Sequence, residues 1–259
     1  MTSQLDALRA TVGRRRARPG PPHVVAVTAG RGGAGVSLVA AMLAIRGAGM
    51  GRRTLLVDAE PWLDVQRVWL GAQRTRTLEE IGSDPIEELV TPVHGSLDLL
   101  SLTAGSSGAR ELRAIVRRVP PLFGDRDLVV VDAGTRLHAL ERMVDLRVGS
   151  VLVVTEPDAI GLASTHAMLK ALIAHTEIPF RILFNRAGHS DAEVASTVLR
   201  DGAKRFLARD LDILGSLPED GMLTSGIASG SRLPELLVQS SLLERVGPVL
   251  SRLLPPAAA

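Results

Sequence analysis

The sequence predicts one α/β domain with a doubly wound, mostly parallel β-sheet. Short runs rich in Val, Leu and Ile recur along the chain without polar alternation, which is typical of strands covered on both faces. Helix-length segments separate these runs, and a glycine-rich turn follows the first run. This βαβ alternation favours a parallel sheet whose ligands bind at the carboxyl ends of the strands.

Composition narrows the class of protein further. The 259 residues suffice for one large domain and not for two with linkers. No apolar run approaches the ~20 residues that cross a bilayer, and residues 1–22 lack the apolar core of a secretory signal. Cysteine is absent, and the net charge of +2 makes no general case for nucleic acid. We therefore expect a cytoplasmic protein without specific nucleic-acid binding.

Residues 1–22 precede the expected domain. Residues 3–12 have the pattern of a short amphipathic helix, with Leu5 and Leu8 on one side. An arginine-rich segment with Pro and Gly follows and is expected to be extended. Its "RRRAR" run suits a solvated linker, with contact to an acidic lipid surface or nucleic acid as the alternative. The domain is expected to span residues 23–254, followed by a tail at 255–259.

The strands are expected at the apolar runs, in chain order. These runs are 23–29, 54–60, 97–104, 127–134, 150–157, 179–187 and 211–218. The final segment, residues 233–254, is expected to be a helix with a kink at Pro248. Its apolar face would carry Leu242, Val246, Val249 and Leu253.

Two placements are open for this last helix, namely packing on the body of the domain or lying on a membrane as an amphipathic anchor. Its polar face balances Glu235 and Glu244 against Arg245 and Arg252. Interfacial helices instead present a face rich in Lys and Arg. We expect packing on the body, and weak or transient contact with the inner face of the plasma membrane is the alternative.

The turn after the first predicted strand has the glycine spacing of a phosphate-binding loop. It reads Gly30, Arg31, Gly32, Gly33, Ala34, Gly35, Val36 and Ser37. Backbone N–H groups of such a turn point inward, and Ser37 stands at the start of a helix, where a hydroxyl would meet Mg²⁺. The standard pattern is G-x-x-x-x-G-K-[ST], so Val36 replaces its lysine. A tight strand-to-helix turn without a ligand is the alternative.

These residues and the blocks that follow resemble the MinD/ParA ATPases. Their loop motif is K-G-G-V-G-K-[ST], and Arg31 occupies the position of its signature lysine. The resemblance implies that Asp58 positions the attacking water and Mg²⁺, and that Asp132 is the second carboxylate on the Mg²⁺ side. Glu60 stands where a second aspartate is usual. Taken alone, each aspartate could also be a strand-end residue that caps the next segment.

Later blocks continue the resemblance in the family's order. They are "VLVVTEPDAIGLASTHAMLKAL", "RILFNRA" and "ILGSLPED". The resemblance implies that Asn185 and the segment around Pro218 face the adenine of ATP. It also implies a nucleotide-dependent homodimer, in which the signature residue reaches across the interface. The cofactors that it implies are ATP and Mg²⁺.

Within this family the chain is most similar to the flagellar-number regulators called FlhG or FleN. The block from Asp58 to Gly71 and the segment 184–220 follow their pattern. In addition, "SQLDALR" resembles the D-Q-A-x-x-L-R element by which those proteins contact the SRP-type GTPase FlhF, and it keeps Gln4, Leu8 and Arg9. The implied partner would bind through residues 3–12, and an ordinary solvated helix is the alternative.

The missing lysine predicts a degenerate ATPase. A charge-assisted hydrogen bond contributes ~1.5–3 kcal/mol, so Val36 should weaken ATP binding by roughly one to a few powers of ten. Hydrolysis should suffer more, because phosphoryl transfer depends on compensating charge. Arg31 would either clamp a partner's nucleotide or hold the loop to a nearby carboxylate. We expect a FlhG-like pseudo-ATPase. The alternatives are an active ATPase using Arg31 and a localisation factor for pili or cellulose synthesis.

Other residues carry weaker signals. Trp62 and Trp69 are seven positions apart and would share a face of a helix, as core packing or as a partner-binding patch. The histidines lack the spacing of metal ligands; they are His23, His94, His138, His166, His175 and His189.

Overall fold

The computed structural model describes residues 21–60, 64–73, 78–82, 84–102, 114, 116–135 and 143–254. Within these residues the chain forms one eight-stranded sheet of order β3-β4-β2-β5-β1-β6-β7-β8. The strands are β1 (His23–Thr28), β2 (Thr54–Asp58), β3 (Val90–His94), β4 (Leu97–Ser101), β5 (Leu128–Asp132), β6 (Ser150–Thr155), β7 (Phe180–Phe184) and β8 (Ile213–Ser216). All neighbouring strands are parallel except β3 and β4. The predicted mostly parallel, doubly wound sheet is confirmed.

The edge strand β3 is an element that the sequence did not predict. Its residues alternate in exposure instead of forming a buried run, and it contains Pro92. It pairs antiparallel with β4, with an irregularity between Pro92 and His94. Proline cannot donate a ladder hydrogen bond, so this position suits a strand that lies at the edge of a sheet.

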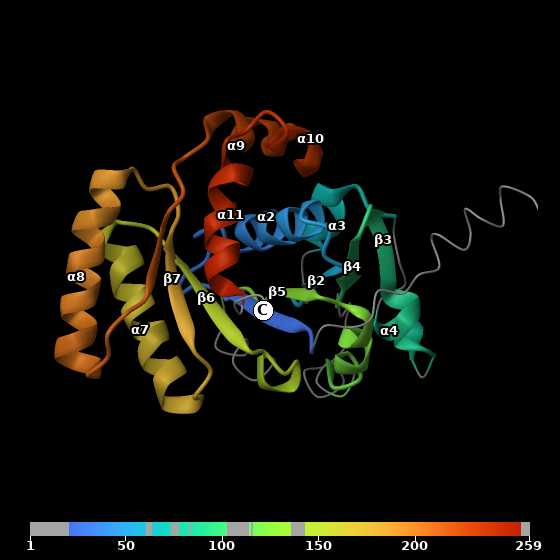
Figure 1. Ribbon diagram of the computed structural model, residues 1–259, viewed down its shortest axis with the longest axis horizontal. Coiled ribbons are helices and arrows are strands. Elements are labelled where there is room, and N and C mark those ends of the chain that lie inside the picture. Colours follow the sequence, from blue (N-terminus) through green and yellow to red (C-terminus); the bar gives the residue numbers. More distant parts are fainter. Residues whose placement is uncertain are drawn as a thin grey trace, which may run out of the picture.

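Helices cover both faces of the sheet, as Figure 1 shows. The α-helices are α2 (Val36–Gly49), α3 (Val65–Leu70), α4 (Leu78–Ile81), α7 (Ala159–His175), α8 (His189–Leu207), α9 (Gly221–Ala228), α10 (Leu233–Leu237) and α11 (Leu242–Leu253). Two 3₁₀ helices are η1 (Ile86–Leu89) and η2 (Pro120–Asp125). One apolar core lies under α2, α3, α9, α10 and α11. The other lies under α4, η1, η2, α7 and α8.

Each central strand contributes to both cores, which explains its uninterrupted apolar sequence. In β1, Val25 and Val27 belong to the core under α2, whereas Val24 and Ala26 belong to the core under α7. Side chains alternate across a strand, so a strand covered on both faces needs apolar residues at every position. The polar residues at the carboxyl ends of these strands depart from this apolar pattern, and they are therefore candidates for a functional site.

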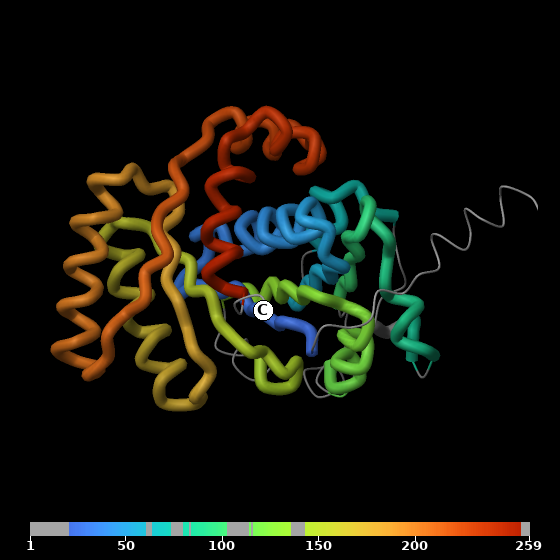
Figure 2. The backbone as a smooth tube through the Cα atoms, viewed as in Figure 1, coloured from blue at the N-terminus to red at the C-terminus, as the bar shows by residue number. Residues whose placement is uncertain are grey.

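The final predicted helix is two helices, α10 and α11, that a turn separates. The face of α11 expected to be apolar is buried, with Leu242, Val246, Val249 and Leu253 all at most 4 % exposed. The helix packs across α2, where Gly247 faces the guanidinium of Arg46, and Figure 2 shows the two helices crossing. Packing on the body is therefore confirmed. Among the described helices, none has the length and apolar character that spanning a bilayer demands.

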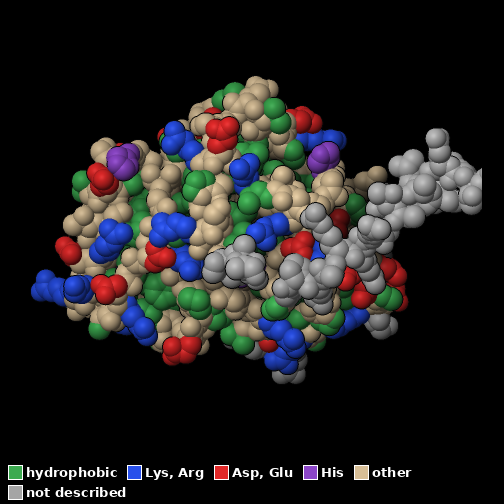
Figure 3. Space-filling view, viewed as in Figure 1, with side chains coloured by type: hydrophobic (Ala, Val, Ile, Leu, Met, Phe, Trp, Pro, Cys, Tyr) green, Lys and Arg blue, Asp and Glu red, His purple; other side chains and the backbone are tan. Residues whose placement is uncertain are grey.

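Several sequence predictions fall outside the described residues. These are the helix 3–12 with Gln4, Leu8 and Arg9, the residue Trp62 and the tail 255–259. Trp69 is described, and it packs partly buried against the core under α2. Acidic and basic side chains are interspersed over the face drawn in Figure 3.

Candidate functional site

The glycine-rich loop lies where the connections of the sheet change direction. It joins the carboxyl end of β1 to α2, and β1 lies between β5 and β6 in the sheet. Ligands of doubly wound sheets bind at such switch points, where the flanking connections diverge. The loop is also followed at once by the N-terminus of the 14-residue helix α2, whose unpaired N–H groups favour an anion.

Two glycines of the loop are required by their neighbours. A Cβ atom on Gly30 would lie 2.1 Å from the carbonyl oxygen of Ser164 in α7. Gly35 has a φ of 94°, and a Cβ atom there would lie 2.2 Å from Nδ2 of Asn185. A side chain at position 30 would clash with the backbone of α7. A side chain at position 35 would clash with Asn185, and the left-handed backbone there would also be strained. The loop is thus shaped by close contact with the segments that follow β6 and β7.

Asp58 and Asp132 lie directly opposite each other at the carboxyl ends of β2 and β5. Each is 1 % exposed. The backbone N–H groups of Glu60 and Gln66 donate to Asp58 at 3.2 and 3.3 Å, and the N–H of Gly134 donates to Asp132 at 3.3 Å. The sequence-predicted pair of carboxylates is therefore brought together, next to the loop.

Burial controls the acidity of these two groups. Loss of hydration raises the pKa of Asp58 well above its ordinary value, and the negative charge of Asp132 raises it further. Loss of hydration also raises the pKa of Asp132, against the lowering effect of hydrogen bonds from Gln66 and from the hydroxyl of Ser37. Among the described residues, no Lys or Arg forms an ion pair with either carboxylate.

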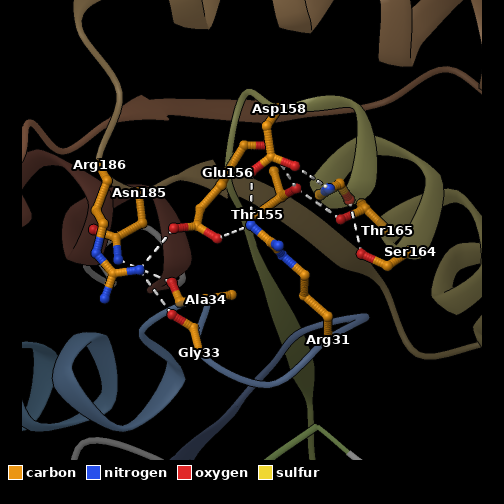
Figure 4. A network of polar contacts seen from close by, with 11 residues as sticks. Arg31, Gly33, Ala34, Thr155, Glu156, Asp158, Ser164, Thr165, Asn185 and Arg186 are labelled. Atoms are coloured by element: carbon orange, nitrogen blue, oxygen red, sulfur yellow. Dashed lines mark hydrogen bonds and ion pairs between the residues drawn. The ribbon is translucent and has the colours of Figure 1, made fainter.

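The side chain of Arg31 points toward the segment after β6 (Figure 4). Its guanidinium forms ion pairs with Glu156 and with Asp158, the latter at 2.6 Å. Asp158 also caps α7, because its carboxylate accepts from the N–H of Gly161 at 2.8 Å. In this structure Arg31 holds the loop to carboxylates of its own chain, and its role at a partner's nucleotide stays a prediction.

A second set of contacts ties the loop to the end of β7. Asn185 donates to the carbonyl of Ala34 at 2.9 Å, and Arg186 donates to the carbonyl of Gly33 at 2.8 Å. Arg186 also pairs with Glu156 at 2.6 Å, so one carboxylate holds two guanidinium groups on either side of the loop (Figure 4). Arg186 has a φ of 51°, a left-handed conformation that is uncommon for a non-glycine residue and costs roughly 1 kcal/mol.

Val36 is buried beneath the loop. It is 5 % exposed and packs in the apolar core under α2. A lysine at this point of a phosphate-binding loop supplies an ammonium group, whereas the valine supplies only packing. Ser37, the next residue, keeps its hydroxyl and is partly exposed. The loop thus retains its glycines and its hydroxyl while it lacks the lysine of the standard motif.

Asn185 and Pro218 follow adjacent strands. The N–H of Leu217 donates to the carbonyl of Phe184 at 2.8 Å, and the N–H of Ala187 donates to the carbonyl of Leu217 at 3.0 Å. These bonds hold the two segments side by side, close to the loop through Asn185. Their role toward an adenine ring stays a prediction.

Sequence reasoning missed Gln66, Glu156, Asp158 and Arg186. Gln66 is a polar residue of α3, and its side chain is fully buried. Glu156 and Asp158 follow the apolar run of β6 directly. Polar residues at strand ends were a usable signal for both acids. The contacts of Arg186 depend on its left-handed backbone conformation, which the sequence does not predict.

The oxygen groups at this site fit a magnesium ion. Carboxylates and hydroxyls are the ligands that Mg²⁺ prefers, and Asp58, Asp132 and Ser37 supply them. Two adjacent buried carboxylates without a paired cation also favour a positive ligand. When bound, the ion would supply positive charge that offsets the negative charge of a phosphate group.

Comparison with known proteins agrees with this geometry. No protein-family model matches the chain. The structure is similar to that of the septum site-determining protein MinD from Pyrococcus horikoshii in complex with Mg-ADP, with a TM-score of 0.71 and 20 % identity, over 89 % of this chain and 95 % of the other. A ParA family ATPase from Chlorobium tepidum gives a TM-score of 0.67 and 20 % identity, over 89 % and 98 %. The chain has the MinD/ParA fold.

Two curated proteins are similar in sequence as well. The antiactivator FleN of Pseudomonas aeruginosa is 27 % identical over 210 residues, covering 77 % of this chain and 75 % of FleN. The MinD protein of Thermotoga maritima is 24 % identical over 237 residues, covering 86 % and 84 %. The similarity to MinD/ParA proteins thus extends over most of the chain.

Proposed function

We propose that the chain is a FleN-like regulator with a weakened nucleotide switch. In this proposal the glycine-rich loop binds Mg-ADP or Mg-ATP, and hydrolysis is slow or absent. The similarity to FleN supports the regulatory role, and the MinD structure with Mg-ADP supports the class of ligand. Flagellar placement or number is the process regulated.

The observation that carries the proposal is the contrast between Val36 and the rest of the loop. Val36 is buried in the core and contributes no charge. Around it, Asn185, Arg186 and Arg31 hold the loop in a defined form. A loop with a maintained cradle and no catalytic cation can bind a nucleotide, but it lacks the charge that stabilises a phosphoryl-transfer transition state.

Calorimetry with Mg-ADP and Mg-ATP tests this proposal directly. The protein itself should bind weakly, and Val36→Lys should bind at least about tenfold more tightly, because each charge-assisted bond contributes ~1.5–3 kcal/mol. Val68→Lys is the control, because Val68 lies exposed on α3 and a lysine there adds the same charge outside the loop. The absence of binding to both the protein and Val36→Lys would contradict nucleotide binding.

The second candidate is an active ATPase in which Arg31 replaces the lost lysine. Arg31 is next to the loop, but two carboxylates of the same chain hold it. We therefore expect single-turnover hydrolysis no faster than that of Asp58→Ala. A rate clearly above that variant, and abolished by Arg31→Ala, would favour the active enzyme.

The proposed partner is an FlhF-type SRP GTPase that binds through residues 3–12. A pull-down with and without residues 1–12 tests this assignment, together with the point variant Leu8→Asp. Binding that persists in the truncated chain would contradict it. Binding to a component of a pilus or cellulose machine, but not to the GTPase, would favour the alternative role as a localisation factor.

We propose a cytoplasmic location and a nucleotide-dependent homodimer. The buried apolar face of α11 argues that this helix does not anchor the resting chain to a membrane. Light scattering with and without Mg-ATP measures dimerisation, and sedimentation with anionic vesicles measures membrane contact. A monomer at saturating nucleotide would contradict the dimer.

A further inference from the structure

Gln66 lies at the centre of the buried polar cluster beside the loop. Its side chain is fully buried. Its Nε2 donates to the carbonyl oxygen of Ser37 and to Oδ2 of Asp132, both at 2.8 Å. Its backbone N–H donates to Oδ2 of Asp58 at 3.3 Å. One residue of α3 therefore contacts the first turn of α2 and the ends of both β2 and β5.

The cluster carries negative charge without a nearby partner. Within the described part of the chain, the arginines close to the loop are engaged elsewhere, since Arg31 pairs with Glu156 and Asp158. Arg67, one residue after Gln66, pairs with Asp64. Val36 contributes no cation. Buried carboxylates are normally paired or bound to a metal ion, so among the described residues this cluster favours a positively charged ligand.

The carboxamide oxygen of Gln66 is a second unsatisfied group of this cluster. Oε1 is buried, and it has no hydrogen-bond partner among the described residues. The amide cannot be reversed to relieve this, because Nε2 already faces two acceptors, the Ser37 carbonyl and Asp132. A buried acceptor without a donor is rare in folded proteins, and such an oxygen is available to coordinate a cation. It lies in the same side-chain amide that contacts Asp132.

We propose that Gln66, with Asp58, Asp132 and the hydroxyl of Ser37, forms a divalent-cation site that fills in the free chain, before a nucleotide binds. Gln66 has two roles there: its N–H groups position Asp132 against α2, and its oxygen is a neutral member of the donor set. Oxygen groups of this kind suit Mg²⁺ or Mn²⁺. The inference rests on the proposed function only because the cation site lies at the proposed nucleotide site. Its test needs no nucleotide.

The experiment titrates the nucleotide-free full-length protein with MnCl₂ and follows free Mn²⁺ by electron paramagnetic resonance. Thermal unfolding in MgCl₂ and in EDTA provides the second readout. We expect about one Mn²⁺ per chain and a higher melting temperature in MgCl₂, since a ligand that binds only the folded state stabilises it. Gln66→Leu should lower the cation affinity by about 10–100-fold, the range for loss of a positioning partner.

Two further variants separate a cation role from a structural one. Gln66→Glu adds a carboxylate at the same place, so it should bind Mn²⁺ more tightly than the protein itself and show a larger Mg²⁺-dependent rise in melting temperature. A merely structural role would not produce that gain. Gln239→Leu is the matched control, because Gln239 is exposed between α10 and α11, and it should bind as the protein itself does. If Gln66→Leu does not fold, Gln66→Glu and the unmodified protein still decide the question.

Three results would overturn the inference. They are the absence of Mn²⁺ binding to the free protein at millimolar concentration, equal affinity in Gln66→Leu, and Mn²⁺ binding that occurs only when ADP is present. Cation binding without any binding of Mg-ADP would support this inference while contradicting the proposed function. Binding of Mg-ADP without prior cation binding would do the reverse.

Discussion

Arg31 and Glu156 form an ion pair that joins the glycine-rich loop to the end of β6. The same carboxylate holds Arg186, which in turn donates to the carbonyl of Gly33. Glu156 is mostly buried, with 13 % of its side chain exposed. The loop is therefore held from both sides by one acidic residue, whose carboxylate pairs with both guanidinium groups.

Glu156→Gln should release this hold. The pairs are only partly buried, so we expect a loss of about 1 kcal/mol in the free energy of unfolding by urea. The affinity for Mg-ADP should rise several-fold, because two guanidinium groups next to the loop lose a shared carboxylate. Asp212→Asn is the control, since Asp212 pairs with Arg181 and Arg252 away from the loop. A lower nucleotide affinity in Glu156→Gln would instead mean that the ion pairs shape the cradle.

Gly30→Ala should destabilise the protein far more than Gly32→Ala. A Cβ atom on Gly30 would lie 2.1 Å from the carbonyl oxygen of Ser164, whereas one on Gly32 would meet nothing within 4 Å. Forcing an atom into packed backbone costs about 1–3 kcal/mol. Urea unfolding of both variants gives the difference directly. Equal stability of the two variants would contradict the close packing of the loop on α7.

The two buried aspartates should give the free chain an inverse dependence on pH. Burial raises the pKa of Asp58 and Asp132 in the folded state, whereas in the unfolded chain both titrate near the ordinary value of about 3.9. Between these values the folded chain keeps protons that the unfolded chain has released. The free energy of unfolding contributed by the pair therefore falls as pH rises through this window.

Asp132→Asn should remove the part of that decline that comes from Asp132 and from its charge next to Asp58, and it should be more stable than the unmodified protein at pH 7 in EDTA. Urea unfolding from pH 4 to 8 measures the slope. Asp220 provides a comparison of opposite sign, because hydrogen bonds from the Ser240 hydroxyl and the Leu223 N–H lower its pKa. Its contribution is present above the unfolded value and is lost as pH falls through the folded value. Asp220→Asn should therefore lose stability at pH 7. A steeper decline in Asp132→Asn would refute the assignment.

Val246→Ala should test the packing of α11 on the domain. Val246 is fully buried between α11 and α2, and removing its methyl groups should cost about 2 kcal/mol in transfer and cavity energy. Val238→Ala removes the same atoms from a residue that is 84 % exposed, so it should be nearly neutral. If both variants unfold at the same urea concentration, α11 does not contribute to the core as described.

The sheet was accessible from the sequence because both of its faces are covered. Runs such as those around Val25 and Val130 are apolar at every position, so their number and order follow directly from the chain. The resemblance to MinD/ParA ATPases assigned Asp58 and Asp132 to one magnesium site, and the carboxyl ends of parallel strands, which meet at one edge of the sheet, bring the two residues together. The edge strand β3 was missed because its exposure alternates and Pro92 interrupts it.

The side-chain contacts of the site were less accessible. Arg31 was recognised as the substitute for a signature lysine, but its partners Glu156 and Asp158 lie far along the chain and only the sheet order brings them close. Gln66 was overlooked because a single polar residue in a short helix is usually solvated. Its importance depends on α3 packing against the ends of two strands, which no local pattern specifies.

The close contact between Gly30 and the backbone of α7 limits what the glycines of the loop indicate about phosphate binding. The helix would exclude a side chain there even if no phosphate were ever bound, and Asn185 does the same at Gly35. The packing of the fold alone requires glycine at these two positions, so their presence is weak evidence for a bound ligand. Stronger evidence for a ligand comes from polar residues that the packing of the fold does not require. These residues are Ser37, the paired aspartates Asp58 and Asp132, and Gln66, which is buried against them.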